Sequence, residues 1–178
     1  MTPPGRGLAI ALGAFVAATV VQRLFELALS ARHARALRAM GGVERARGHF
    51  AYIVLVHTLY LPALAAEVVA LGARPGAAWP LWLALWLGAQ GLRAAAMRAL
   101  GVRWTTRIWV LPGAPLVTRG PYRWLRHPNY LAVAVELAAG PLLFGAWRTA
   151  LAISALDAVA LAVRIRAENR ALRDARGA

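Results

Sequence analysis

Five long apolar stretches, separated by polar segments rich in arginine, dominate the hydrophobic pattern of the chain. A membrane-spanning helix needs about 20 mostly apolar residues. The five stretches approach that length, and they are Leu8–Leu29, Phe50–Leu71, Ala77–Met97, Tyr130–Trp147 and Thr149–Val163. We therefore predict an all-α integral membrane protein with five transmembrane helices, the last two of which form a tight hairpin.

The polar segments divide a single domain of 178 residues into two parts. Residues 1–100 hold the three N-terminal spans. Residues 101–178 hold a long loop, the helical hairpin and a helix that continues from the fifth span through Arg164–Arg173. The loop, 101–129, contains three Trp, a Tyr and the turn signals Pro112-Gly113 and Gly120-Pro121. A loop this long is usually functional, and we expect it to fold over one mouth of the helix bundle.

The arginines predict the orientation of the chain in the membrane. All 21 basic residues are Arg, and 17 of them lie at helix ends and in loops on one side of the predicted spans, against 3 on the other. Because cytoplasmic loops carry an excess of Lys and Arg, we expect the N-terminus outside and the C-terminus in the cytosol, with a bacterial inner membrane as the location. The net charge of +14 is then explained by topology and contact with membrane lipids, and it does not indicate a nucleic-acid partner.

Two absences limit the chemistry. The chain has no Cys and no Lys, which excludes disulfides, thiolate metal sites, Cys nucleophiles and lysine Schiff bases. Direct transfer of a group between two bound molecules needs none of these.

Three blocks in the second half carry a resemblance. They read Leu116-Val117-x-x-Gly120-x-Tyr122, then Arg126-His127-Pro128-Asn129-Tyr130, then Arg164-x-x-x-Glu168-x-x-x-Leu172. In residue types and spacing they resemble the isoprenylcysteine carboxyl methyltransferase family. The upstream segment from Arg23-Leu-Phe-Glu26 to His57 is similar to a bacterial branch of that family, whose members methylate hydroxyl groups of alkylpyrones and alkylresorcinols.

The resemblance implies an S-adenosylmethionine site that faces the cytosol. The residues that it assigns to the cofactor are Ala114, Pro115, Leu116, Val117, Tyr122, Arg126, His127, Pro128, Asn129, Tyr130 and Glu168. Arg164 falls on the substrate side. The implied activity is an O-methyltransferase acting on a lipidic acceptor, either a hydroxyl or a prenylated carboxylate, that enters from the bilayer.

A layer of polar residues crosses the predicted spans at a common depth. Counted inward from the cytosolic helix ends, Arg23, His57, Gln90, Glu136 and Asp157 all lie roughly 10–12 Å below that face. Polar residues inside a membrane are costly and usually face the bundle interior. One interpretation is a structural network in which Arg23, Glu26, Glu136 and Asp157 satisfy one another. The other makes Glu136 or His57 the base that accepts a proton from a hydroxyl acceptor. Of the two we favour Glu136, because it lies less than two turns from Tyr130 on the same predicted helix.

Other interpretations of the sequence remain open. The acceptor could be the amine of a phospholipid head group, the protein could be a nicotinamide-dependent enzyme resembling sterol reductases, or the polar layer could be the ion path of a small transporter. Glu67, near the outer end of the second span, is expected to cap or pair.

Overall fold

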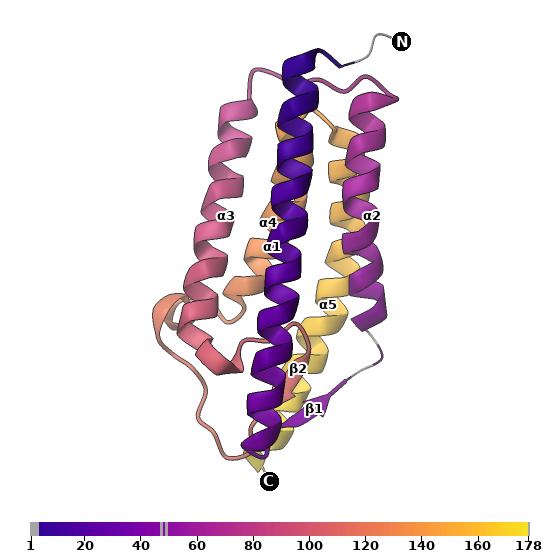
Figure 1. Cartoon of the computed structure of the whole chain (residues 1–178). Coiled ribbons are helices and arrows are strands. Elements are labelled where there is room, and N and C mark those ends of the chain that lie inside the picture. Colours follow the sequence, from indigo (N-terminus) through magenta and orange to yellow (C-terminus); the bar gives the residue numbers. More distant parts are fainter. Residues whose placement is uncertain (1–3, 47, 49, 178) are drawn as a thin grey trace.

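A computed structural model describes residues 4–46, 48 and 50–177 as one bundle of helices (Figure 1). Its long helices are α1 (Arg6–Ala39), α2 (Phe50–Val69), α3 (Trp79–Leu100), α4 (Pro128–Leu143) and α5 (Trp147–Gly177). The two chain ends lie at opposite ends of the bundle. Within the described residues, α1 and α2 are long and apolar enough to cross a membrane.

The first helix extends beyond the predicted span. The predicted span covers Leu8–Leu29, with the following arginines between the first and second spans, and α1 continues through this segment to Ala39. Ala, Arg and Leu all favour helix, so the segment 30–39 has no reason to break. The helix stops where Gly41 adopts a φ of +84° and the Gly42 N–H donates to the Leu37 carbonyl at 2.7 Å. Arg47, which also belongs to the basic side, lies outside the described residues.

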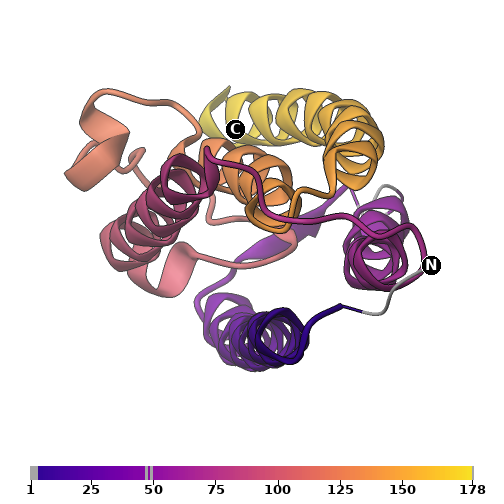
Figure 2. The same ribbon diagram turned by 90° about the horizontal axis from the view of Figure 1, so that it is seen from above.

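Helix α4 is the centre of the bundle. Seen from above, it lies between α3 and α5 (Figure 2). Helix α1 lies at the lower edge of this view and α2 at its right edge. Its buried Val133 and Leu137 pack against Val56 and Tyr60 of α2 and Ile153 of α5. The start of α4 is thereby held against its neighbours, and the functional residues just before it gain a fixed position.

The predicted hairpin is present and is anchored at the N-terminal end of the bundle. Between α4 and α5, Gly145 has a φ of +71°, and a Cβ at this position would lie 1.8 Å from the Arg74 carbonyl oxygen. Glu67 accepts hydrogen bonds from the backbone N–H of Arg148 at 3.1 Å and of Thr149 at 2.6 Å, and from the Thr149 hydroxyl at 2.7 Å. The prediction that Glu67 caps or pairs is confirmed, because it caps the start of α5.

The all-α prediction misses a small antiparallel sheet. Strand β1 (Val43–Arg45) pairs with β2 (Ile108–Val110), with Glu44 opposite Trp109. The pairing joins segments that are far apart in the sequence, so no local pattern indicates it. Ile108 and Val110 pack on Ala171 near the end of α5. The described residues also include the short 3-10 turns η2 (Gly101–Arg103) and η3 (Gly120–Arg123).

Candidate active site

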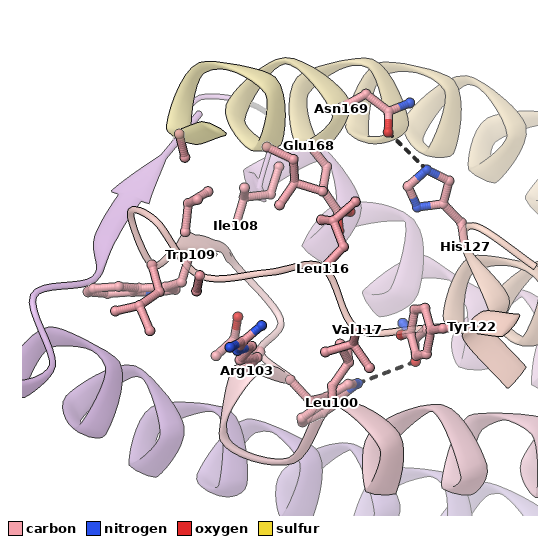
Figure 3. Close-up of a pocket in the computed structure, with 18 of the residues that line it drawn as sticks. Leu100, Arg103, Ile108, Trp109, Leu116, Val117, Tyr122, His127, Glu168 and Asn169 are labelled. Atoms are coloured by element: carbon pink, nitrogen blue, oxygen red, sulfur yellow. Dashed lines mark hydrogen bonds between the residues drawn. The ribbon is translucent and has the colours of Figure 1, made fainter. Parts of the chain in front are cut away.

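A cavity of about 550 Å³, lined by both polar and apolar side chains, lies between the 101–129 loop, the start of α4 and the C-terminal part of α5 (Figure 3). We call it the loop cavity. In Figure 3, Glu168 and Asn169 enter from α5 on one side, and Leu100 at the end of α3 and Arg103 of η2 lie on the other. Leu116 and Val117 lie on the segment of loop that crosses between them.

The loop is held in place by hydrogen bonds from arginine side chains to backbone carbonyls. Arg103 Nη1 donates to the Pro115 carbonyl at 2.6 Å, and Arg119 Nε donates to the Ala99 carbonyl at 2.9 Å. These contacts tie Pro115 to η2 and Arg119 to the end of α3. Fixing a loop in this way lowers the conformational cost of binding a ligand against it.

A second set of contacts ties the loop to α1. His33 Nδ1 lies 2.7 Å from the Trp104 carbonyl, and the Ser30 hydroxyl accepts from the Thr106 backbone N–H at 2.9 Å. The Trp104 indole N–H reaches Asn129 Oδ1 at 3.4 Å. Trp104 is buried, so these bonds fix one wall of the cavity.

The start of α4 presents an aromatic and imidazole pair to the loop cavity. His127 precedes Pro128, which occupies the first turn where its missing N–H costs nothing. The His127 ring stacks on Tyr130 at 5.3 Å between centroids, and its Nε2 lies 3.2 Å from Asn169 Oδ1. His127 is thereby held between α4 and α5.

Tyr130 also links Arg164 to Glu168 on α5. Arg164 Nε donates to the Tyr130 hydroxyl at 2.8 Å, and this hydroxyl donates to Glu168 Oε2. Arg164 and Glu168, four residues apart, are therefore joined through a buried residue of α4. Close by, burial raises the pKa of the Tyr122 hydroxyl, and the Glu168 carboxylate raises it further.

A second cavity, of about 670 Å³, lies within the bundle. We call it the membrane cavity. It is mostly apolar, and its walls come from α1, α2 and α5, with Val20, Leu24, Val54 and Leu61 among them. The two cavities share five wall residues, which are Trp104, Thr105, Asn129, Tyr130 and Arg164. The two cavities therefore adjoin at these side chains.

A buried network of two arginines and two glutamates lies beneath this shared wall. Arg23 donates to Glu26 at 2.7 Å and to Glu136 Oε1 at 2.8 Å. Arg93 lies 3.3 Å from both Glu26 oxygens and also donates to Glu136 Oε2. Gln90 accepts a bond from Gln22. The charges of the four ionised groups cancel, as a buried cluster requires.

The predicted site residues fall into three groups. All of the predicted cofactor residues except Pro128 line the loop cavity, and Arg164 lines both cavities. His57 lines the membrane cavity. Glu136 is fully buried and lines neither cavity.

Sequence reasoning missed several wall residues and one network member. Asn169 lines the loop cavity, and its position directly after Glu168 was the available signal. Trp109 lines the same cavity from β2, a strand that no local pattern predicts. Arg93 was counted only as a topology signal near the end of a span, whereas its side chain is buried in the network.

Comparison with known proteins agrees with this arrangement. A model of the isoprenylcysteine carboxyl methyltransferase family matches residues 82–174. The chain is 38% identical to the uncharacterized protein YpbQ of Bacillus subtilis, over 89% of this chain and 95% of the relative. It is 27% identical to an uncharacterized protein of Haemophilus influenzae, over 84% of this chain and 88% of the relative. No solved structure matches.

The matched region begins in α3 and ends in α5, so it includes the whole loop, the start of α4 and the part of α5 that together enclose the loop cavity. The family match covers more than half of the chain, and YpbQ is similar over nearly its full length. The chain belongs to the isoprenylcysteine carboxyl methyltransferase family, whose members are membrane methyltransferases that use S-adenosylmethionine.

Proposed function

We propose that this protein transfers a methyl group from S-adenosylmethionine to a hydroxyl of a lipidic acceptor of the alkylpyrone or alkylresorcinol type. The observation that carries the proposal is the wall shared by the two cavities. A cavity of mixed polar and apolar lining, suited to a cofactor with charged groups and a purine ring, meets a mostly apolar cavity suited to a lipid at Asn129, Tyr130 and Arg164.

The residues of the loop cavity fit the groups of the cofactor. Glu168 offers a carboxylate for the ammonium group or the ribose hydroxyls of S-adenosylmethionine. Arg126 and His127 offer hydrogen-bond donors for the carboxylate of the cofactor. The face of Tyr122 suits a cation such as a sulfonium. Leu116 and Val117 give apolar contact for a purine ring.

Bound S-adenosylmethionine supplies an activated methyl group on a positively charged sulfur. The task left to the protein is alignment and exclusion of water, because charge is neutralised as the methyl group moves. Arg164 and Tyr130 are bonded to each other at the shared wall, which suits them to orienting the acceptor.

The acceptor enters from the bilayer in this proposal. The membrane cavity is lined by apolar residues of α1 and α2, and the outer faces of these helices expose apolar side chains such as Val21 and Leu55. A molecule with an alkyl tail would reach the cavity between helices without leaving the lipid. We propose five membrane spans, with the loop cavity on the cytosolic side, in line with the arginine distribution.

His57 is the group that we propose as the base for the acceptor hydroxyl. Its Nδ1 lies 2.9 Å from the Ile53 carbonyl, which accepts only, so the proton is on Nδ1 and Nε2 carries a free lone pair. The sequence favoured Glu136 as the base, but each oxygen of Glu136 already accepts a hydrogen bond from an arginine. The geometry therefore favours His57 as the base that accepts the proton and Glu136 as a structural member of the arginine–glutamate network.

The other enzyme classes receive no support from the family match. Methylation of a phospholipid amine uses the same cofactor, so only the identity of the methylated acceptor distinguishes it from the proposed reaction. A nicotinamide-dependent reductase differs from the proposed enzyme in the cofactor that it binds.

The test uses the purified protein in detergent. We expect S-adenosylhomocysteine to raise its melting temperature, and His127→Ala and Glu168→Ala to abolish that shift, whereas Asp174→Asn, an exposed carboxyl on α5, leaves it intact. Labelled methyl transfer is then measured to a long-chain alkylresorcinol, an alkylpyrone, a prenylcysteine and phosphatidylethanolamine. A response to NADPH alone, or methyl transfer only to the last two acceptors, would contradict the proposal.

A further inference from the structure

Asp157, in the middle of α5, is a buried carboxyl without a partner. The residue is 2% exposed and lines the membrane cavity. It forms no hydrogen bond or ion pair with any other residue in the described part of the chain. An isolated carboxyl inside a membrane protein is costly, and such residues usually mark a functional site.

The cations near Asp157 are already bonded to other groups. Arg23 acts on Asp157 electrostatically, but its two terminal nitrogens donate to Glu26 and Glu136. Arg164 donates its Nε to Tyr130. Asp157 therefore differs from Glu26 and Glu136, the other two buried carboxyls in this half of the bundle, because no arginine donates to it.

The position of Asp157 relates it to the shared wall. It precedes Arg164 by seven residues, which is about two helical turns, so both lie on one face of α5 about 10 Å apart along the axis. Both line the membrane cavity. An acceptor whose reacting oxygen lies at the shared wall would place the far side of its head group toward Asp157.

We infer that Asp157 recognises the acceptor by taking a hydrogen bond from a second hydroxyl on its head group. The inference rests on the proposed function and narrows its substrate class to ring compounds with two hydroxyl groups. An unpaired carboxylate in an apolar cavity binds a hydrogen-bond donor strongly. An acceptor that lacks this donor leaves the carboxylate unpaired, so the site discriminates against it.

Two lipids that differ by one hydroxyl group test this inference. The first is a 5-alkylresorcinol with a long alkyl chain, and the second is the 3-alkylphenol of the same chain length. We expect the wild type to prefer the resorcinol in kcat/KM by about 10- to 100-fold, the size of a hydrogen bond to a charged group. Asp157→Leu is expected to remove the preference by lowering kcat/KM for the resorcinol alone. Asp157→Asn, which keeps an acceptor oxygen, should retain part of the preference for the resorcinol.

Asp174→Asn on the same helix is the matched control, and it should keep the full preference. Thermal stabilisation by S-adenosylhomocysteine should be unchanged in all variants. Equal losses for both lipids in Asp157→Leu, or an unchanged preference, would overturn the inference and leave the proposed function standing. A wild type that neither responds to S-adenosylhomocysteine nor methylates either lipid would overturn the proposed function itself, and the inference with it.

Discussion

Arg164 and Tyr130 are joined at 2.8 Å through the arginine Nε and the phenol oxygen, at the wall that separates the two cavities. The same phenol donates to Glu168. The four-residue spacing of Arg164 and Glu168 suggests an ordinary surface pair, but Tyr130 from another helix stands between them. The Tyr130 hydroxyl thus connects Glu168, on the predicted cofactor side, to Arg164, on the predicted substrate side.

Tyr130→Phe is expected to weaken both sides of this contact. The phenyl ring keeps the packing, but Arg164 and Glu168 lose a shared partner, which costs about 1–3 kcal/mol. We expect the KM for S-adenosylmethionine to rise by about 10-fold and the stabilisation by S-adenosylhomocysteine to fall. Tyr52→Phe is the control, because that hydroxyl is exposed and bonds only weakly to the Leu156 carbonyl at 3.4 Å. Equal effects of the two substitutions would contradict the assignment.

Glu136→Gln is expected to destabilise the fold. It leaves Arg23 and Arg93 short of a negative partner inside the bundle, and breaking a buried pair in this way costs about 3–5 kcal/mol. The melting temperature in detergent measures the loss.

The double variant Arg93→Met with Glu136→Leu removes one charge of each sign and leaves Arg23 paired with Glu26. We expect it to be more stable than Glu136→Gln, because apolar groups of similar size often replace a buried pair at little cost. A double variant that is less stable than the single one would show that the network contributes more than charge balance.

Gly145→Ala is expected to strain the hairpin between α4 and α5. The new methyl group would lie 1.8 Å from the Arg74 carbonyl oxygen, and the φ of +71° is unfavourable for alanine. We expect a lower melting temperature. Gly91→Ala in α3 is the contrasting control, since its Cβ would meet nothing within 4 Å, and alanine in a helix interior is favoured by about 0.5–1 kcal/mol. The two substitutions should shift the melting temperature in opposite directions.

The orientation in the membrane can be tested with single cysteines, since the natural chain has none. Gly76→Cys lies in the exposed connection between α2 and α3, and Arg123→Cys lies on η3 beside the loop cavity. We expect a membrane-impermeant thiol reagent to label Gly76→Cys in intact cells and Arg123→Cys only after the cells are opened. The reverse pattern would place the loop cavity outside.

The sequence alone was sufficient for what depends on local pattern. Apolar stretches of membrane length predicted the five helices, and a short break beside Arg148 predicted the hairpin. Blocks of closely spaced residues indicated the family, because their members are near one another in the chain. Such features are visible without knowing how the helices rotate about their axes.

Only the tertiary structure decided which polar residues meet. The polar layer suggested that Glu136 and Asp157 were equivalent, but the bundle surrounds Glu136 with Arg23 and Arg93 and leaves Asp157 on the wall of a cavity. The pairing of β1 with β2 was invisible for a related reason. Partners on different elements are set by helix rotation and long-range packing, and a periodic pattern gives the buried face of a helix without giving its neighbour.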